Sequence, residues 1–293
     1  MKNHKFWVGE PDYRIAVKRW GEADKNKQVI MLVHGTGFVA ESWEDVAKTL
    51  SENYTVYAID RRGHGESFKP ALSHYHFADF AHDLYRVIED LGLSNVIGVG
   101  HSAGATDILL CTKFASDRFD RILAIEPTIM NPGEYRPGVK LSDWGESSIQ
   151  RALKRRLHFE NFDTALELLQ AAPGLANWQE NAIRTYLTYG FETLDDGRLR
   201  LLCTPEIEAA MARPIFEAME QIYVGDHRGN PFQWLFDIKC PVRIYTAQQS
   251  FPIYSDMASR AMSMIPGATH EILNDVGHCV PQESPDIVIE ALT

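Results

Sequence analysis

The sequence predicts an α/β fold: a doubly wound, mostly parallel sheet with an inserted, mainly helical cap. Short apolar segments alternate with helix-like segments, which is typical of βαβ units. The expected strands are 28–34, 55–60, 96–100, 122–126, 242–247 and 269–273, and the expected helices are 43–50, 77–91, 105–114 and 255–264. Because several apolar segments are almost continuously hydrophobic, we expect a parallel sheet covered by helices on both faces.

Two departures from this alternation predict the rest of the architecture. Residues 5–9 and 13–20 alternate in polarity around a Pro-Asp pair, which favours an antiparallel hairpin at the sheet edge. Residues 128–235 are mostly helix-like and rich in aromatic side chains, with one hairpin expected at 194–202 around Asp196 and Gly197. We therefore expect a core of residues 1–127 and 236–293 and a cap of residues 128–235.

The composition of the chain limits the classes of partner that the protein is expected to bind. The 293 residues carry a formal net charge of −11, which argues against a nucleic-acid binder. The basic residues Lys154 to Arg156 are expected to form a solvated helix face. No apolar segment approaches the roughly 18 residues that cross a bilayer, and the N-terminus lacks a signal-like apolar stretch. We expect a cytoplasmic protein with a small-molecule substrate and no membrane partner, and a homo-oligomer remains open.

The four cysteines are far apart in sequence and show no CxxC pairing. We therefore expect free buried thiols rather than disulfides or a zinc site, and we expect neither a metal nor a cofactor. Cys279 is adjacent to His278, which leaves a Cys–His pair as an alternative. Neighbouring residues on a loop usually point apart, so this alternative is disfavoured.

A nucleophile is predicted at Ser102. The segment Gly100-His101-Ser102-Ala103-Gly104 matches G-x-S-x-G, directly after an expected strand and before an expected helix. This strand-turn-helix context is what the motif requires, because the sharp turn exposes the serine oxygen near the positive end of a helix.

Two backbone N–H groups are expected to stabilise an oxyanion. One belongs to Ala103, immediately after the predicted nucleophile. The other lies in the glycine-rich turn that begins at His34; Thr36 is the expected donor, with Gly37 or Phe38 as alternatives. His278 follows the last expected strand and precedes the final helix, where the histidine of a Ser–acid–His triad belongs.

Four segments together resemble the α/β-hydrolase superfamily: HGTG at 34–37, DRRGHGES at 60–67, GHSAG at 100–104 and GHCVPQESP at 277–285. The resemblance covers the core, roughly residues 10–127 and 238–293. The branch resembled includes capped esterases, lactonases, carbon–carbon bond hydrolases, haloalkane dehalogenases and epoxide hydrolases. The last two need a carboxylate nucleophile, so Ser102 argues against them.

The triad acid departs from the commonest family pattern. Its usual position follows the strand 242–247, but the segment from Thr246 to Ser250 contains no carboxylate. An amide or hydroxyl cannot replace an ionised carboxylate beside an imidazolium. Some family members carry the acid after the preceding core strand, where this sequence has Glu126. We expect Glu126 to be the acid, with Asp256 or an unusual acid as alternatives.

These residues predict a serine hydrolase that cleaves an ester or lactone of an apolar small molecule through an acyl-enzyme. A carbon–carbon bond hydrolase with the same triad is the main alternative, and a non-catalytic ligand receptor on the same fold is a weaker one. The residues expected to bind the substrate are Gly35, Gly37, Phe38, His101, Trp178 and Tyr186.

Overall fold

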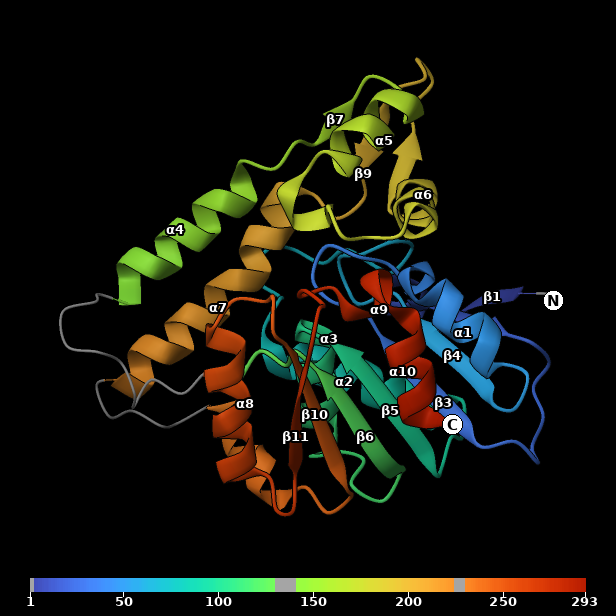
Figure 1. Ribbon diagram of the computed structural model, residues 1–293, viewed down its shortest axis with the longest axis vertical. Helices are drawn as coiled ribbons and strands as arrows, with labels where there is room; N and C mark the ends of the chain where they lie inside the picture. Colours follow the sequence, from blue (N-terminus) through green and yellow to red (C-terminus); the bar gives the residue numbers. More distant parts are fainter. Residues whose placement is uncertain (1–2, 130–140, 224–229) are drawn as a thin grey trace.

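An eight-stranded sheet forms the centre of the molecule (Figure 1). The computed structural model describes residues 3–129, 141–223 and 230–293. The strands lie in the order β1 (Asn3–Val8), β2 (Ile15–Trp20), β4 (Thr55–Ile59), β3 (Val29–Val33), β5 (Val96–His101), β6 (Phe119–Ile125), β10 (Val242–Ala247) and β11 (Thr269–Leu273). β1 and β2 are antiparallel, and the strands from β4 to β11 are parallel. The predicted mostly parallel sheet and edge hairpin are confirmed.

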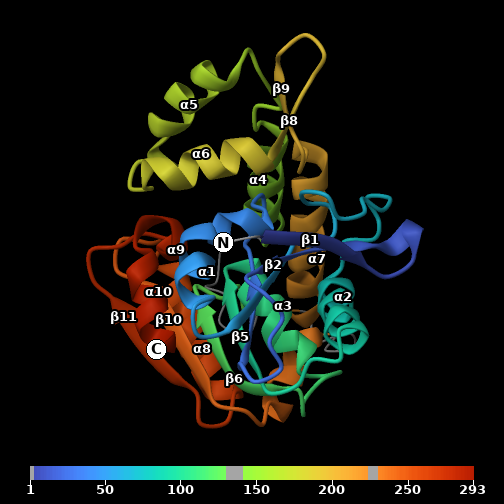
Figure 2. The same ribbon diagram turned by 90° about the vertical axis from the view of Figure 1, so that its right-hand side faces the viewer.

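Helices cover both faces of this sheet. One face carries α1 (Glu44–Leu50) and α10 (Pro285–Leu292), preceded by the short α9 (Val280–Glu283). The other carries α2 (Phe77–Asp90), α3 (Ala103–Cys111) and α8 (Ile253–Met264). Figure 2 shows α1 and α10 on one side of the sheet and α2 on the other. In β3, Ile30 and Leu32 pack on the first face and Met31 and Val33 on the second, which explains why these strands are continuously apolar.

The chain between β6 and β10 forms the predicted insertion. It contains α4 (Leu141–Leu153), α5 (Phe162–Gln170), α6 (Glu180–Tyr189) and α7 (Pro205–Tyr223). A small sheet joins β7 (His158–Phe159), β9 (Leu199–Leu201) and β8 (Phe191–Thr193). The expected hairpin at 194–202 is confirmed, and Gly197 in its turn has a φ of 84°. The segments 130–140 and 224–229 of the expected cap lie outside the described residues.

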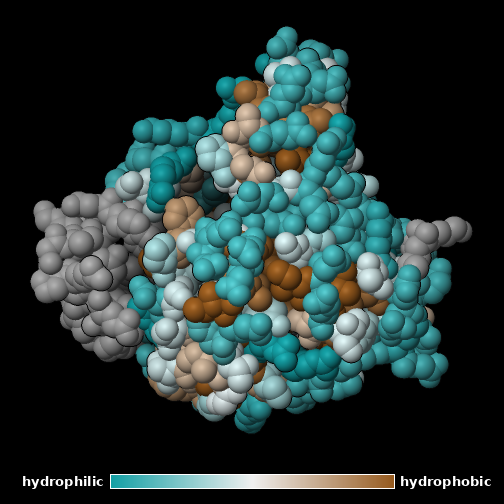
Figure 3. Space-filling model, in the orientation of Figure 1, coloured by the Kyte–Doolittle hydropathy of each residue, from teal (hydrophilic) through white to brown (hydrophobic). Residues whose placement is uncertain are grey.

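The molecular surface in Figure 3 is largely hydrophilic, with hydrophobic residues in a band across the core. The same view shows a recess between the inserted segment and the core. In the part of the chain that the structure describes, no helix combines the length and the hydrophobicity needed to span a bilayer.

Buried polar side chains hold the loops at the carboxyl edge of the sheet. Asp60, at the end of β4, accepts hydrogen bonds from the N–H groups of Ala40 (2.7 Å) and Glu66 (2.9 Å). Arg61 forms a buried ion pair with Asp107 of α3 at 2.5 Å. Because isolated buried charges are costly, this pairing fixes the loop after β4 against α3.

Two buried histidines complete this framework, and both must be neutral. Nδ1–H of His64 donates to the carbonyl of Arg62 at 3.0 Å, and Nε2 accepts from the N–H of Gly37 at 2.9 Å. His34 similarly donates to Gly35 O and accepts from Arg61 N. Burial, reinforced by the Arg61 charge, lowers the pKa of His34 to about 3. Burial likewise lowers the pKa of His64 well below its ordinary value of 6.5.

The turn between β5 and α3 depends on close backbone approach. A Cβ atom on Gly104 would collide with the carbonyl oxygens of Val33 and His34 at the end of β3. We predict that Gly104→Ala lowers the free energy of unfolding by about 3 kcal/mol, because backbone cannot move aside cheaply. Urea titration would measure the loss. Gly174→Ala is the control, since nothing lies within 4 Å of its added atom; an equal effect of both substitutions would contradict this packing.

Because the buried His64 stays neutral in the folded protein, the free energy of unfolding should decrease on acidification. Below pH 6.5 the unfolded chain protonates this residue while the folded protein does not, so folded-state stability falls as the pH falls. We predict that the wild type loses up to about 1.4 kcal/mol more per pH unit than His64→Gln between pH 6.5 and 5. Urea unfolding at pH 7, 6 and 5 measures the difference. Parallel pH curves for the two proteins would show that His64 is charged in the folded state.

Candidate active site

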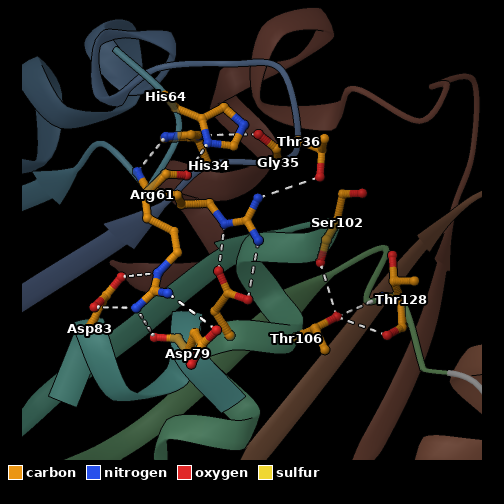
Figure 4. Close-up of polar contacts among 12 residues, drawn as sticks. His34, Gly35, Thr36, Arg61, His64, Asp79, Asp83, Ser102, Thr106 and Thr128 are labelled. Carbon is orange, nitrogen blue, oxygen red and sulfur yellow. Dashed lines mark hydrogen bonds and ion pairs between the residues drawn. The ribbon is translucent and has the colours of Figure 1, made fainter. Parts of the chain in front are cut away.

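Ser102 occupies a sharp bend between β5 and α3. Its backbone angles are φ 53° and ψ −123°, a conformation that costs a non-glycine residue free energy and is often found at functional sites. The N–H of Ser102 donates to the carbonyl of Ile125 at 2.8 Å, which ties the bend to β6. In Figure 4 the Ser102 carbonyl faces Thr106, while its hydroxyl points away from that residue. The bend therefore presents the hydroxyl away from the helix that follows it.

Glu126 lies directly against His278. Its Oε2 is 3.0 Å from Nδ1 of His278, although 152 residues separate the two in sequence. The Glu126 side chain is fully buried, and the residue has a left-handed φ of 51°. A buried carboxylate needs hydrogen-bond donors. Two more come from the end of β10 and the turn that follows it: the N–H of Ala247 at 2.7 Å and the hydroxyl of Ser250.

This contact determines which nitrogen of His278 is available. Nδ1 carries the proton that it donates to Glu126, so Nε2 of the neutral ring keeps its lone pair. Asp256, the other carboxylate considered from the sequence, is exposed on α8. The structure therefore brings Glu126, and not Asp256, to this histidine.

Two aromatic rings flank His278. Tyr254, in the first turn of α8, stacks on the imidazole with ring centroids 4.5 Å apart and an interplanar angle of 27°. Burial raises the pKa of Tyr254 to about 12, so its hydroxyl keeps its proton at neutral pH. The His101 ring lies 4.9 Å from that of His278, and its Nε2–H donates to the His278 carbonyl at 2.8 Å. The imidazole of His278 is therefore packed against two aromatic rings.

Glu283 fixes the loop that carries His278. Its carboxylate accepts from the N–H of Gly277 at 2.7 Å and from the N–H of Cys279 at 3.1 Å. These two hydrogen bonds fall on either side of His278. The loop is therefore held at both neighbours of the histidine by one side chain from α9.

The loop after β3 approaches Ser102 closely. A Cβ on Gly35 would lie 3.2 Å from Cβ of Ser102, so glycine permits the approach. The N–H of Gly37 donates a hydrogen bond to Nε2 of His64 at 2.9 Å, and the N–H of Phe38 donates to Gly35 O at 3.3 Å. Within the described residues, the N–H groups of Thr36 and Ala103 have no hydrogen-bond partner. Arg61 approaches the Thr36 hydroxyl at 3.4 Å (Figure 4).

The inserted segment covers this loop with aromatic side chains. Phe38 lies 5.2 Å from Trp178, 5.7 Å from Tyr186 and 6.0 Å from His101, measured between ring centroids. Trp178 and Tyr186 are buried, and the Tyr186 hydroxyl donates to Gly37 O at 3.0 Å. These residues, predicted to bind substrate, form one cluster that joins the inserted segment to the core.

The basic residues Lys154 to Arg156 differ from the prediction of a solvated face. Lys154 and Arg156 are exposed, but Arg155 is partly buried. Its guanidinium pairs with Glu208 and donates to the Tyr186 hydroxyl at 3.2 Å. Because the Tyr186 hydroxyl also donates to Gly37 O, Arg155 is linked through Tyr186 to the loop after β3. The pattern of charges in the sequence does not indicate this link.

Among the described residues, neither the cysteines nor a cluster of metal-ligating side chains gives a competing site. Burial raises the pKa of Cys279 to about 12, so its thiol stays neutral beside His278. All four cysteines lie within the described residues and are free and buried. Across the same residues, no group of three or more His, Cys, Asp or Glu side chains could hold a metal ion.

Sequence reasoning missed three residues around His278: Ser250, Tyr254 and Glu283. Ser250 lies in the segment where the commonest family pattern has its acid, and that position is the only signal that could have identified it. Glu283 lies five residues after His278, but its two backbone contacts depend on the fold of α9. Nothing in the sequence distinguishes Tyr254 from an ordinary helix residue.

The chain has extensive similarity to known hydrolases. It is 25% identical to 2-(acetamidomethylene)succinate hydrolase of Mesorhizobium japonicum over 270 residues, which cover 90% of this chain and 86% of the relative. It is 23% identical to a putative esterase/lipase of Haemophilus influenzae, covering 91% and 82%.

A solved structure supports the same fold. The crystal structure of E-2-(acetamidomethylene)succinate hydrolase superimposes with a TM-score of 0.79 at 23% identity, covering 100% of this chain and 98% of that one. The family model for the alpha/beta hydrolase family matches residues 30–291. With this match over most of its length, the chain belongs to the alpha/beta hydrolase family.

Proposed function

We propose that this protein is a serine hydrolase that cleaves a carboxylic ester or lactone of an apolar small molecule. Ser102 is the nucleophile, His278 its general base and Glu126 the acid that orients the base. The observation that carries the proposal is the 3.0 Å contact between Glu126 and Nδ1 of His278. It fixes the tautomer in which Nε2 accepts a proton, and it stabilises the imidazolium that follows.

The reaction proceeds through an acyl-enzyme. His278 removes the Ser102 proton as Oγ attacks the substrate carbonyl carbon. The N–H groups of Thr36 and Ala103 stabilise the oxyanion. The engagement of Gly37 and Phe38 in other hydrogen bonds supports Thr36 as the donor in its loop. The leaving group then takes the proton from His278, and a water activated by the same residue releases the acid.

Amide hydrolysis is a second candidate, because one relative that covers most of the chain is named for a substrate that contains an amide. That name also specifies a succinate, which is a dicarboxylate. Among the residues that the structure describes, two arginines that reach the loop after β3 pair with carboxylates: Arg61 with Asp107 and Arg155 with Glu208. This pairing favours an apolar ester or lactone over a dicarboxylate.

The proposed nucleophile is tested by burst kinetics with a p-nitrophenyl ester. We expect the wild type to release one equivalent of p-nitrophenol rapidly per site, because acylation of Ser102 precedes hydrolysis. Ser102→Ala should lose both the burst and the turnover. Ser259→Ala, at an exposed serine of α8, is the matched control and should retain both. A burst that survives in Ser102→Ala would exclude Ser102 as the nucleophile.

The proposed acid is tested by a pair of isosteric substitutions. Glu126→Gln should lower kcat by about 1,000- to 10,000-fold, because a neutral amide permits the wrong imidazole tautomer and does not stabilise the imidazolium. Asp256→Asn should leave kcat within about threefold of wild type, since that carboxylate is exposed on α8. Steady-state kinetics with circular dichroism as a folding check measure both. Comparable rates for Glu126→Gln and the wild type would place the acid elsewhere.

A further inference from the structure

Gly37, the residue that follows the proposed oxyanion donor Thr36, is held at both of its polar backbone groups. Its N–H donates to Nε2 of His64 at 2.9 Å, and its carbonyl oxygen accepts from the Tyr186 hydroxyl at 3.0 Å. His64 belongs to the core, in the loop after β4, whereas Tyr186 belongs to α6 of the inserted segment. The loop that carries Thr36 is therefore fixed from the core and from the inserted segment at a single residue.

The four residues from Gly35 to Phe38 form a closed turn. The N–H of Phe38 donates to Gly35 O at 3.3 Å, and Gly37 has a φ of 86°. A positive φ at the third of four turn residues is typical of a type II turn, which does not use the N–H of its second residue, here Thr36. The turn lies against Ser102, because a Cβ on Gly35 would be 3.2 Å from Cβ of Ser102. A rotation of the turn would therefore change the direction of the Thr36 N–H.

The hydrogen-bonding capacity of the Tyr186 hydroxyl is used within the protein. The hydroxyl donates its one proton to Gly37 O and accepts from Nη2 of Arg155 at 3.2 Å. Arg155 is itself paired with Glu208 of α7. Burial raises the pKa of Tyr186, so the hydroxyl keeps the proton that it donates. Because a phenol has a single donor, a hydroxyl that donates to Gly37 does not donate to a substrate at the same time.

The Tyr186 ring and the helix that carries it are held independently of this hydroxyl. The ring packs edge-on against Phe38, with centroids 5.7 Å apart and an interplanar angle of 89°. The Asn181 amide donates to Asp45 of α1 at 3.0 Å, which ties α6 to the core. Loss of the hydroxyl alone should therefore leave the ring and the helix in place. Gly37 is buried, and a buried carbonyl that loses its donor is costly, so the turn would shift to recover one.

We propose that Tyr186 is a positioning residue that fixes the turn from Gly35 to Phe38, so that the N–H of Thr36 points at the substrate oxygen. This inference rests on the proposed serine hydrolase function. Arg155 acts through Tyr186 by holding its hydroxyl. The inserted segment then contributes to the reaction itself, because acylation and deacylation both pass through an oxyanion that the Thr36 N–H stabilises.

Tyr186→Phe tests the proposal by steady-state kinetics with p-nitrophenyl butyrate. We expect kcat to fall about 10- to 100-fold, which is less than the loss of a whole oxyanion donor. KM should stay within about threefold, because acylation and deacylation are slowed together. Tyr189→Phe, at an exposed tyrosine of the same helix, is the matched control and should retain the wild-type kcat. A higher KM at unchanged kcat would show that Tyr186 binds substrate instead, and it would overturn the proposal, as would unchanged kinetics.

The infrared stretch of the acyl-enzyme carbonyl gives a second readout, which a loss of stability alone would not change. Hydrogen bonds from oxyanion donors lower the frequency of this stretch. With p-nitrophenyl butyrate isotopically labelled at its carbonyl carbon, we expect the band of the Tyr186→Phe acyl-enzyme to lie at higher frequency than those of the wild type and Tyr189→Phe. A band at the wild-type frequency in Tyr186→Phe would overturn the proposal.

Should Tyr186→Phe fail to fold, as judged by circular dichroism, Arg155→Gln tests the same link, because it removes the donor to the Tyr186 hydroxyl and leaves the ring untouched. We expect kcat to fall about 3- to 10-fold at unchanged KM, with a shift of the carbonyl band in the same direction. Wild-type kinetics and an unshifted band in this variant would overturn the proposal. A wild type without a burst would instead refute the serine hydrolase function itself, so the two failures are distinguishable.

Discussion

The arrangement of the site depends on one buried carboxylate. Glu126 directly follows β6, has a left-handed backbone conformation and contacts His278, which lies near the C-terminal end of the sequence. A fully buried carboxylate is costly unless each oxygen is satisfied, and this one has donors from Ala247, Ser250 and His278. The same hydrogen bonds that make its burial possible also determine the orientation of the imidazole. One carboxylate therefore both ties these loops together and positions the histidine.

The segment after β10 contacts both Glu126 and His278 and helps to hold them in place. It is the segment where the commonest pattern of the family has its acid, yet here Ser250 donates to Glu126 and Tyr254 stacks on His278. Glu283 completes the frame by holding the backbone on both sides of the histidine. In the loop after β3, the neutral His64 accepts a hydrogen bond from the N–H of Gly37, whereas the N–H of Thr36 has no partner among the described residues. Three loops from distant parts of the sequence thus converge on the bend at Ser102.

The sequence predicted the fold well because the sheet follows local rules. The apolar strands, the edge hairpin and the turn at Gly197 each carry their signal in a few neighbouring residues. The strand-helix context of Ser102 is also local. The partners of Glu126 were harder to predict, because Ser250 and Tyr254 reach it and His278 only after β6, β10 and β11 pair in register. Arg155 was misjudged for a similar reason: its contacts with Glu208 and Tyr186 cross the inserted segment.

A crystal structure of the protein treated with a serine-reactive phosphonate would test the nucleophile, the oxyanion donors and the acid together. We predict a phosphorus–oxygen bond to Ser102, one phosphonyl oxygen within about 3.1 Å of the N–H groups of Thr36 and Ala103, and Nδ1 of His278 still bonded to Glu126. A phosphonyl oxygen turned away from both N–H groups, or an imidazole that has left Glu126 for another carboxylate, would contradict it.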